Sequence, residues 1–222
     1  MRVLLTDLDR TLTDETLILH PGVPTAIASL RRAGVAAILV TGRSYDHLLA
    51  NGHDATFDAL VAENGAIVSV GTGGAPDVLH ERFAGTAREA LDAFASEIAW
   101  GRVIGSAARA LTKDIGAALH AAGIAHALVP NADEIMILPP GVDKATGARR
   151  ALHLLGATGA TTWAIGDGEN DVVLLEMADV AAVAQNAHPA ARAVADIELP
   201  ERYGEAFLLL VEKMLAAPNA KR

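Results

Sequence analysis

The stretch LLTDLDRTLT, residues 4–13, places two aspartates one residue apart directly after an apolar run. In an extended segment, residues i and i+2 point to the same side, so the carboxylates of Asp7 and Asp9 would face one volume. Ligands of α/β sheets bind beyond the carboxyl ends of the strands, which is where these residues stand. The alternative is a turn in which the aspartates cap backbone N–H groups. Taken alone, the pair favours neither interpretation.

A second acidic stretch, IGDGEND at residues 165–171, also follows an apolar run. Gly166 and Gly168 permit a tight backbone and the close approach of a ligand. Asp167 and Asp171 add two more carboxylates. Four carboxylates in one cleft would repel one another and raise their own pKa values, and a hard divalent cation removes that problem. Because Mg²⁺ combines a few carboxylates with waters and phosphate oxygens, the two stretches together indicate a metal site that also binds a phosphoryl group.

Two further segments have residue types that bind anions. In VTGR, residues 40–43, Thr41 can donate its hydroxyl and Gly42 its backbone N–H, and the following helix offers its positive end. Arg43 can add a bidentate contact to an anion. Lys144 begins a predicted helix and would supply a point positive charge for a phosphate. Taken singly, each of these residues is more often part of an ordinary turn or surface.

The elements that must bring these residues together are short apolar strands alternating with helices. This alternation predicts parallel βαβ units in a sheet that is covered on both faces. Pro24 in the first turn and Gly34 after the end mark the first helix. Strands are predicted at 3–6, 35–42, 58–71 (with a turn), 161–168 and 180–184, and helices at 24–32, 44–52, 144–155, 171–178 and 203–216.

From about Gly71 the pattern changes, beginning with the loop signal GTGGAPD. The segment that follows predicts helices at 86–99 and 113–122 and strands at 102–107, 125–129 and 134–138. We therefore predict an α/β fold: a doubly wound, mostly parallel sheet with a small inserted α+β domain. The core would comprise residues 1–75 and 140–222, and the insertion residues 76–139.

Composition limits the classes of function. The chain has 222 residues, of which 51% are hydrophobic and 20% charged, so it can bury a sizeable core. With 27 acidic and 18 basic residues its net charge is −9, which argues against nucleic acid or an anionic membrane as the main partner. It contains no cysteine, which excludes disulfides, thiolate zinc sites and cysteine nucleophiles. No apolar stretch has the length of a signal peptide or a membrane span, so a cytoplasmic protein is expected.

In their order along the chain, DLDRT, TGR, Lys144 and GDGEND resemble the haloacid dehalogenase (HAD) superfamily of phosphohydrolases. ENGA (63–66) and VAQNAHPAARAVAD (183–196) resemble its Cof-type branch, whose class IIB cap lies between the second and third motifs. The resemblance implies an HAD-like core and Mg²⁺-dependent hydrolysis of the phosphomonoester of a small metabolite, a sugar phosphate or a phosphoglycolate-like acid, through an aspartyl-phosphate. Two residues depart from the family pattern: Arg10 stands where Gly is frequent, and Ala145 follows Lys144 where Gly is common. The insertion is also short for a class IIB cap.

The same resemblance implies a role for each matching residue. Asp7 would be the nucleophile, and Asp9 would act as general acid and then base while its backbone carbonyl ligates Mg²⁺. Glu63 and its two neighbours would form part of the substrate pocket. The implied set is catalytic Asp7, Asp9 and Lys144; substrate-binding Thr41, Gly42, Arg43, Asn64, Gly65 and Asn170; and metal-binding Asp7, Asp9, Asp167 and Asp171. The eight histidines show no metal-ligand spacing, and His188 is interpreted as structural.

Three other functions remain open from the sequence. A phosphomutase could use the same covalent intermediate. A phosphoacceptor receiver module also arranges aspartates, Thr and Lys around magnesium, but its acceptor lies mid-chain after a third strand. A non-enzymatic phospho-ligand sensor would be favoured by loss of Asp9, which is present. The identity of the phosphorylated metabolite, movement of the cap, and a monomeric or homodimeric state are not determined.

Overall fold

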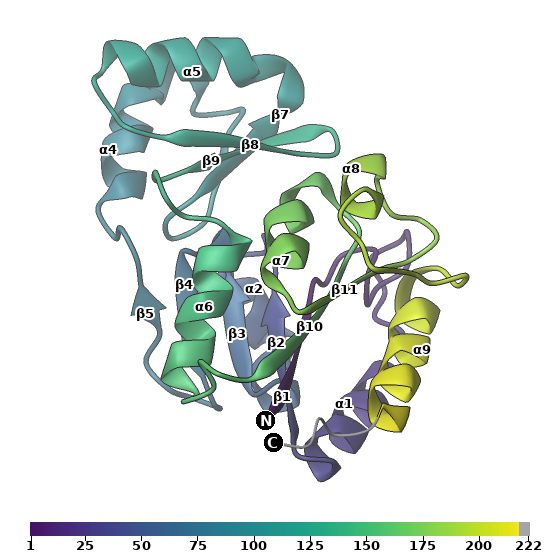
Figure 1. Ribbon diagram of the computed structural model, residues 1–222. Coiled ribbons are helices and arrows are strands. Elements are labelled where there is room, and N and C mark those ends of the chain that lie inside the picture. The colour runs from purple at the N-terminus through teal and green to yellow at the C-terminus, as the bar shows by residue number, and fades with distance from the viewer. Residues whose placement is uncertain (218–222) are drawn as a thin grey trace.

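The computed structural model describes residues 1–217 of the chain. Within these residues the chain forms an eight-stranded sheet and a separate four-stranded sheet, each with its own helices, and the smaller unit lies over one edge of the larger (Figure 1). This arrangement confirms the predicted α/β class with a large, mostly parallel sheet. None of the helices in this part of the chain is both long and apolar enough to cross a membrane.

The large sheet places the first strand of the chain near its centre. Its strands are β1 (Arg2–Thr6), β2 (Val35–Val40), β3 (Ala59–Ala62), β4 (Ile67–Val70), β5 (Asp77–Val78), β10 (Thr161–Gly166), β11 (Val180–Val183) and β12 (Ile197–Glu198). Their order is β12-β11-β10-β1-β2-β3-β4-β5; the pairs from β12 to β3 are parallel, and the pairs β3–β4 and β4–β5 are antiparallel. Because the chain moves outward from β1 in both directions, the sheet is doubly wound, and the gap between neighbouring crossovers opens beside β1.

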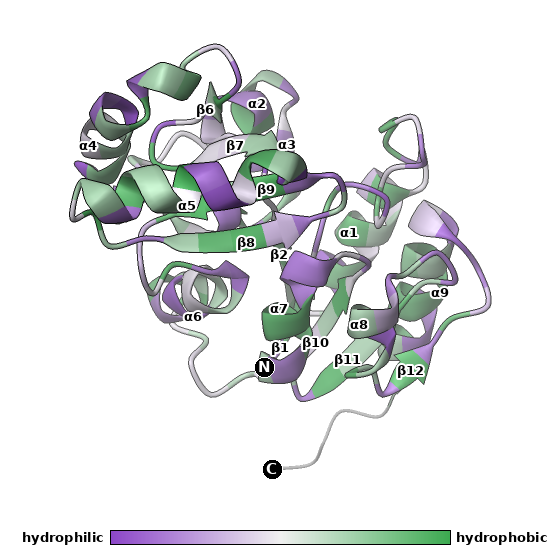
Figure 2. Cartoon of the chain, turned by 90° about the horizontal axis from the view of Figure 1, so that it is seen from above, coloured by the Kyte–Doolittle hydropathy of each residue, from purple (hydrophilic) through white to green (hydrophobic). Residues whose placement is uncertain are grey.

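Helices cover both faces of this sheet (Figure 1). They are α1 (Val23–Arg32), α2 (Tyr45–Ala50), α3 (His53–Thr56), α6 (Lys144–Leu154), α7 (Val172–Met177), α8 (Pro189–Arg192) and α9 (Tyr203–Ala216). Alternate residues of β1 serve the two faces: Leu4 packs in the layer formed by α1 and α9, whereas Val3 and Leu5 pack in the layer formed by α6 and α7. Figure 2 shows the apolar residues along β10 and β11 and in α7, which covers them.

The small unit, here called the cap, has its own core. It contains α4 (Phe83–Ala90), β6 (Ala99–Trp100), β7 (Gly105–Ala108), α5 (Thr112–Ala121), β8 (Ala127–Asn131) and β9 (Glu134–Leu138). The strands pair antiparallel in the order β6-β7-β9-β8. Ile115 and Leu119 of α5 pack with Ile135 and Ile137 of β9. The helices thus lie on the outer face of the cap sheet, and its other side is turned toward the large sheet (Figure 1).

The predicted helix at 86–99 is wrong in its extent. In the structure α4 ends at Ala90, a short 3₁₀ turn follows, and β6 begins at Ala99. No Gly or Pro marks this break, which arises from tertiary packing: Leu91 and Ile98 are buried in the cap core, and β6 pairs with β7. The strand predicted from residue 102 begins at Gly105, because residues 101–104 form the turn between β6 and β7.

Other boundaries also differ from the prediction. The strand predicted at 35–42 ends at Val40, so Thr41 and Gly42 lie in the loop that follows it. The short elements α3, β5, α8 and β12 had no signal in the sequence. The predicted limits of the insertion, 76 and 139, stay predictions; β5, at residues 77–78, pairs with β4 of the large sheet, and all four cap strands lie between these limits.

Candidate active site

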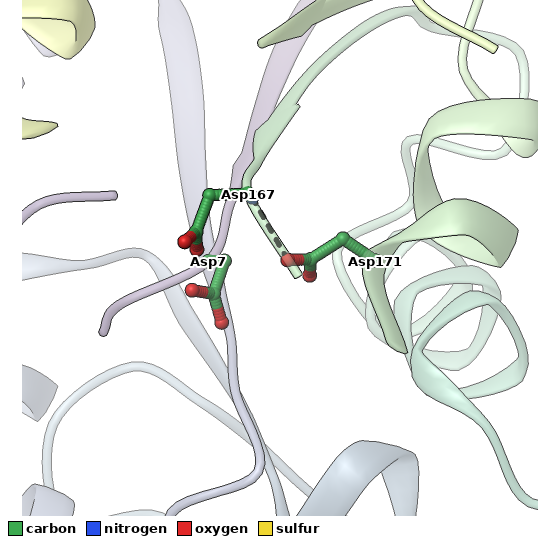
Figure 3. Close-up of side chains that lie close together, drawn as sticks. All are labelled: Asp7, Asp167 and Asp171. Atoms are coloured by element: carbon green, nitrogen blue, oxygen red, sulfur yellow. Dashed lines mark hydrogen bonds between the residues drawn. The ribbon is translucent and has the colours of Figure 1, made fainter. Parts of the chain in front are cut away.

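The two acidic stretches meet at the carboxyl edge of the large sheet. Asp7 follows β1, and Asp167 follows the neighbouring parallel strand β10; the backbone N–H of Asp7 donates to the carbonyl of Ile165 at 3.0 Å. Asp171 reaches back from the 3₁₀ turn Glu169–Asp171. One carboxylate oxygen from each of the three aspartates lies within 4.8 Å of those of the other two. Figure 3 shows the three side chains close together. These three residues are called the acidic cluster below.

The loop after β10 is folded tightly around Asp171. Oδ2 of Asp171 accepts the backbone N–H of Asp167 at 3.0 Å, the dashed line in Figure 3, and that of Gly168 at 2.8 Å. A Cβ atom at position 166 would lie 2.5 Å from Cγ of Asp171. Gly166 therefore makes room for this carboxylate and allows the tight backbone that the motif predicted, while the close approach of a ligand stays a prediction.

Lys144 is the cation of this site. Its Nζ donates to Oδ1 of Asp7 and to Oδ1 of Asp171, each at 2.6 Å, and its side chain is 1% exposed. The lysine is the first residue of α6 because Asp143 and Thr146 form a capping box that starts the helix there. Burial lowers the pKa of Lys144, but the charges of Asp171 and Asp7 outweigh it and raise that pKa above its usual value. The ammonium group is therefore charged at neutral pH.

The acidic cluster carries more negative charge than Lys144 balances. Burial raises the pKa of Asp7 well above its usual value, and the charge of Asp171 adds to this effect while Lys144 opposes it. Burial and the charge of Asp171 likewise raise the pKa of Asp167 to about 7. Three hard oxygen donors that repel one another in this way fit a divalent cation such as Mg²⁺, which would be held by all three carboxylates.

Asp9 faces the same cavity but lies apart from the acidic cluster. Its carboxylate accepts two hydrogen bonds from Arg43, from Nε at 2.7 Å and from Nη2 at 3.0 Å. Both side chains are 34% exposed. The hydrogen bond to Asp9 raises the pKa of the Arg43 guanidinium. The i, i+2 spacing thus directs both aspartates to one cavity, and their cationic partners are different.

A second ion pair joins the cap to the loop after β10. Nη1 of Arg109 lies 2.8 Å from Oε2 of Glu169, and Nη2 lies 3.3 Å from Oε1. Nη1 also donates to the carbonyl of Ala132 in the turn between β8 and β9. Arg109 is half exposed. The two pairs, Asp9–Arg43 and Arg109–Glu169, are called the rim pairs below.

Thr41 and Gly42 follow β2, on the other side of β1 from Asp167. Thr41 is buried, and its hydroxyl accepts the backbone N–H of Arg43 at 3.2 Å. Gly42 lies beneath the cap sheet, close to Met136 of β9: a Cβ on Gly42 would be 3.0 Å from Cε of Met136. Both residues line the cavity above the acidic cluster. They stand where the sequence placed an anion-binding turn.

Asn64 connects the core to the cap and to the loop after β10. Its Oδ1 accepts a hydrogen bond from Nδ2 of Asn170 at 3.2 Å, and its Nδ2 donates to Sδ of Met136 at 2.7 Å. Gly65 has a φ of +104° and packs against the start of α6, since a Cβ there would lie 2.1 Å from the carbonyl oxygen of Asp143. Asn64 therefore lies behind the wall of the cavity, and Gly65 contacts the backbone of α6.

A cavity of about 570 Å³ lies between the acidic cluster and the turn that joins β8 and β9. The cap contributes Asn131, Asp133 and Glu134 to its wall, and the core contributes Arg10 and Leu17. Lys144, Asn64 and Gly65 are not among its lining residues. Of the predicted site residues, Asp7, Asp9, Thr41, Gly42, Arg43, Asp167, Asn170 and Asp171 all line it.

Among the lining residues that the sequence analysis did not predict are Asn186 and His188. Nδ2 of Asn186 donates to the backbone carbonyl of Arg10 at 2.9 Å and approaches Oδ2 of Asp167 at 3.4 Å. His188 was interpreted as structural; its Nδ1 accepts the N–H of Ala190 at the start of α8, and its side chain is exposed to the cavity. Both residues lie in the segment 183–196, whose resemblance to the Cof-type branch was the signal that could have identified them.

Comparisons with known proteins agree with this geometry. Residues 4–79 and 109–205 match the family described as haloacid dehalogenase-like hydrolase. The phosphoglycolate phosphatases of Methanoculleus marisnigri and Methanothrix thermoacetophila are each 28% identical; the alignments cover 96% of both chains for the first, and 95% of this chain and 96% of the relative for the second. The solved structure of Thermoplasma acidophilum 0175 matches with a TM-score of 0.81 at 18% identity, over 97% of this chain and 99% of that one. The HAD subclass IIB sugar phosphatase BT4131 matches with a TM-score of 0.76 at 15% identity, over 96% and 99%.

Proposed function

The chain belongs to the haloacid dehalogenase-like hydrolases, and from this premise we propose that it is a Mg²⁺-dependent phosphatase of a small phosphorylated metabolite. The observation that carries the proposal is the meeting of the acidic cluster with Lys144 beneath a cavity that the cap covers in part. Phosphoryl transfer needs in-line positioning and charge stabilisation, and this site contains groups for both. The relatives named phosphoglycolate phosphatase support the same reaction class.

In the proposed reaction Asp7 is the nucleophile. Lys144 holds Oδ1 of Asp7, which leaves Oδ2 to attack the phosphorus atom. The new Oδ2–P bond forms as the bond from phosphorus to the leaving oxygen breaks, which yields an aspartyl-phosphate and an alcohol. Water then attacks the phosphorus of this intermediate, the Oδ2–P bond breaks, and inorganic phosphate leaves. The ammonium of Lys144 opposes the negative charge on Asp7 and on the phosphoryl group in both steps.

Mg²⁺ held by the acidic cluster would supply positive charge opposite the phosphoryl oxygens. The chain itself would orient those oxygens: the Thr41 hydroxyl and the Gly42 N–H lie on the side of β1 opposite Asp167. Asn170 lines the cavity and is held by Asn64. A ligand role for the backbone carbonyl of Asp9 stays a prediction.

Asp9 would donate a proton to the leaving oxygen and later remove one from water. Both carboxylate oxygens of Asp9 are engaged by Arg43, so neither can exchange a proton with a leaving oxygen or with water while the pair is intact. We infer that an entering phosphate separates the pair, because its oxygens compete for the Arg43 guanidinium. Arg43 would then bind the substrate, and Asp9 would be free to take the proton it transfers.

The cavity supports a small leaving group in this proposal. Its roof is the cap turn with Asp133 and Glu134, whose carboxylates accept hydrogen bonds from hydroxyl groups, as a sugar phosphate would provide. Its wall also carries Arg10, which has a φ of 59° and would bind the carboxylate of a phosphoglycolate-like acid. Both substrate classes are therefore included in the proposal.

The experiment is a phosphate-release screen of sugar phosphates, phosphoglycolate and other small phosphomonoesters, with Mg²⁺ or with EDTA. We expect release that requires the metal and is absent from the Asp7→Asn variant. Product analysis separates hydrolysis from transfer of the phosphoryl group to a second sugar. A folded wild-type protein that releases phosphate from none of these compounds would reject the proposed function.

A further inference from the structure

Glu63 is a core residue whose carboxylate binds the cap. It directly follows β3 and is 1% exposed. Its Oε1 accepts the backbone N–H of Arg102 at 2.9 Å, and its Oε2 accepts those of Val103 at 2.8 Å and Ile104 at 3.1 Å. These consecutive N–H groups belong to the cap hairpin, defined here as β6, the turn 101–104 and β7. One side chain of the core therefore binds three consecutive backbone groups of the cap.

The backbone on both sides of this contact is adapted to it. A Cβ at position 101 would lie 2.6 Å from the carboxylate of Glu63, so only glycine leaves room for the acid. Glu63 and Asn64 both have a φ of 51°, and Gly65 has a φ of 104°. Two non-glycine residues in the left-handed region are strained, and such strain persists where surrounding contacts enforce it.

The contact is also stronger than the other link to the hairpin. Glu63 takes part in no ion pair within residues 1–217, and its carboxylate accepts its hydrogen bonds from backbone N–H groups. A shift of the hairpin that breaks these hydrogen bonds while the carboxylate is still covered would leave the carboxylate without partners, which is costly. By contrast, Arg102 pairs with Asp46 at the surface and stacks over Tyr45, in a contact that solvent screens.

The hairpin is directly connected to the cavity roof. In the cap sheet β7 pairs with β9, and this register places Ser106 opposite Met136 and Ala108 opposite Glu134. Glu134 lines the cavity, and Met136 contacts both Gly42 and Asn64. A shift of the hairpin would therefore move the roof relative to the acidic cluster.

We propose that Glu63 is a positioning residue, which holds the cap hairpin so that the cavity roof stands at a fixed place above Asp7. This inference rests on the proposed phosphatase function, because it states how the leaving group is located for the reaction. Glu63 itself does not touch the cavity above the acidic cluster. It acts through residues 102–104 and the β7–β9 pairing.

The test is the Glu63→Gln variant, which keeps the shape of the side chain and replaces one acceptor oxygen with an N–H₂ group facing the hairpin N–H groups. Two substrates are compared: the sugar phosphate that the screen finds to be hydrolysed fastest, whose hydroxyl groups would reach the roof, and acetyl phosphate, whose leaving group is only acetate. We expect kcat/KM to fall about tenfold or more for the first and less than about threefold for acetyl phosphate. A merely structural role would reduce both equally, through the fraction of folded protein.

Hydrogen exchange provides a readout that is independent of activity. The amides of residues 102–104 should exchange at least about tenfold faster in Glu63→Gln than in the wild type. Asp46→Asn is the matched control, because it removes the surface contact to the same hairpin. In this variant we expect the exchange rates of the Val103 and Ile104 amides, and kcat/KM for each of the two substrates, to stay within about threefold of the wild type. If Glu63→Gln does not fold, Gly101→Ala displaces the hairpin from the carboxylate and should produce the same selective loss.

Two results would overturn the positioning role: unchanged exchange at residues 102–104 in Glu63→Gln, or an equal loss of kcat/KM for both substrates. A wild type that releases phosphate from none of the compounds in the screen would instead reject the proposed function. The exchange measurement would still decide whether Glu63 holds the hairpin.

Discussion

The acidic cluster and the rim pairs differ in how deeply their charged groups are buried and in how completely negative charge is matched by positive charge. In the cluster, the carboxylates of Asp7 and Asp171 are at most 7% exposed, and the whole group has a single ammonium as its cation. In the rim pairs each carboxylate meets one guanidinium, and each pair has at least one side chain about a third or more exposed. The cluster is thus fixed and short of positive charge, whereas the rim pairs are balanced and solvated. We infer that the cluster binds the metal and phosphoryl group in place, while the rim pairs are the contacts that change as substrate enters.

The largest effect is expected at Asp7, the proposed nucleophile of the cluster. Asp7→Asn removes the attacking oxygen, so phosphate release should fall by about 10⁴-fold or more. The fold should persist, because the amide is close in shape and the cluster loses one of its mutually repelling charges. Phosphate release and far-UV circular dichroism check the two halves of this prediction. Substantial turnover by the purified variant would remove Asp7 from the nucleophile role.

The cation of the cluster should matter more for stability than any other lysine. Lys144→Met leaves Asp7 and Asp171 buried without their shared partner, which should lower the free energy of unfolding by about 3–5 kcal/mol. Urea unfolding in EDTA measures it. Lys113→Met, on the exposed side of α5, is the control and should change stability by less than about 0.5 kcal/mol. Equal losses in the two variants would mean that the buried ion pairs contribute nothing beyond an ordinary surface lysine.

A smaller effect should follow pH in the metal-free protein. The pKa values of Asp7 and Asp167 are raised in the folded state, that of Asp167 to about 7, so the folded protein keeps protons that the unfolded chain has already released. Stability from these groups is therefore complete below about pH 4, the range of an unfolded aspartate, and is lost as pH rises through about 7. Thermal unfolding in EDTA should show a midpoint that falls between pH 5 and pH 8.

Metal should reverse that loss. Mg²⁺ binds ionised carboxylates, so it should raise the unfolding midpoint more at pH 8 than at pH 5. Asp167→Asn is the control for other titrating groups, and it should flatten the pH dependence in EDTA. If the unfolding midpoint in EDTA falls with rising pH equally in the wild type and in Asp167→Asn, or does not fall in either, this account would be contradicted.

The smallest effect is expected at the rim. Arg109→Gln removes a half-exposed ion pair with Glu169, so the unfolding free energy should change by less than about 1 kcal/mol. The same change loosens the cap from the loop after β10, and KM should shift more than kcat. A loss of stability as large as that of Lys144→Met would erase the distinction between the cluster and the rim.

The sequence predicts the acidic cluster better than it predicts the partners of each carboxylate. The spacing of Asp7 and Asp9 and the strand-end position of both acidic motifs suffice to place them at one cavity. Which cation pairs with which aspartate depends on residues that are far apart in the sequence. Lys144 is 137 residues from Asp7 and Arg43 is 34 residues from Asp9, and no local pattern encodes these pairs. The catalytic, substrate-binding and metal-binding roles stay predictions until the variants are measured.

The fold shows the same division between local and distant causes. Alternation of apolar runs was enough to find β1, β2, β10 and β11, which are buried and parallel. The helix predicted at 86–99 was wrong because burial of Leu91 and Ile98 and pairing of β6 with β7 override its local propensity. The contact of Glu63 with the cap was also not predictable, since its partners are backbone N–H groups 39 to 41 residues away and carry no side-chain signature.

The close approach of the turn at Gly65 to α6 has a consequence for mutational surveys. A Cβ on Gly147 would lie 2.4 Å from Cα of Gly65, and Gly147 is one helical turn beyond Lys144. A single methyl group at either glycine would act as a wedge that tilts the start of the helix and withdraws the ammonium from its two acids. Inactivating alleles should therefore occur at two positions that do not line the cavity above the acidic cluster, and ranking variants by distance from the reacting atoms would misclassify both.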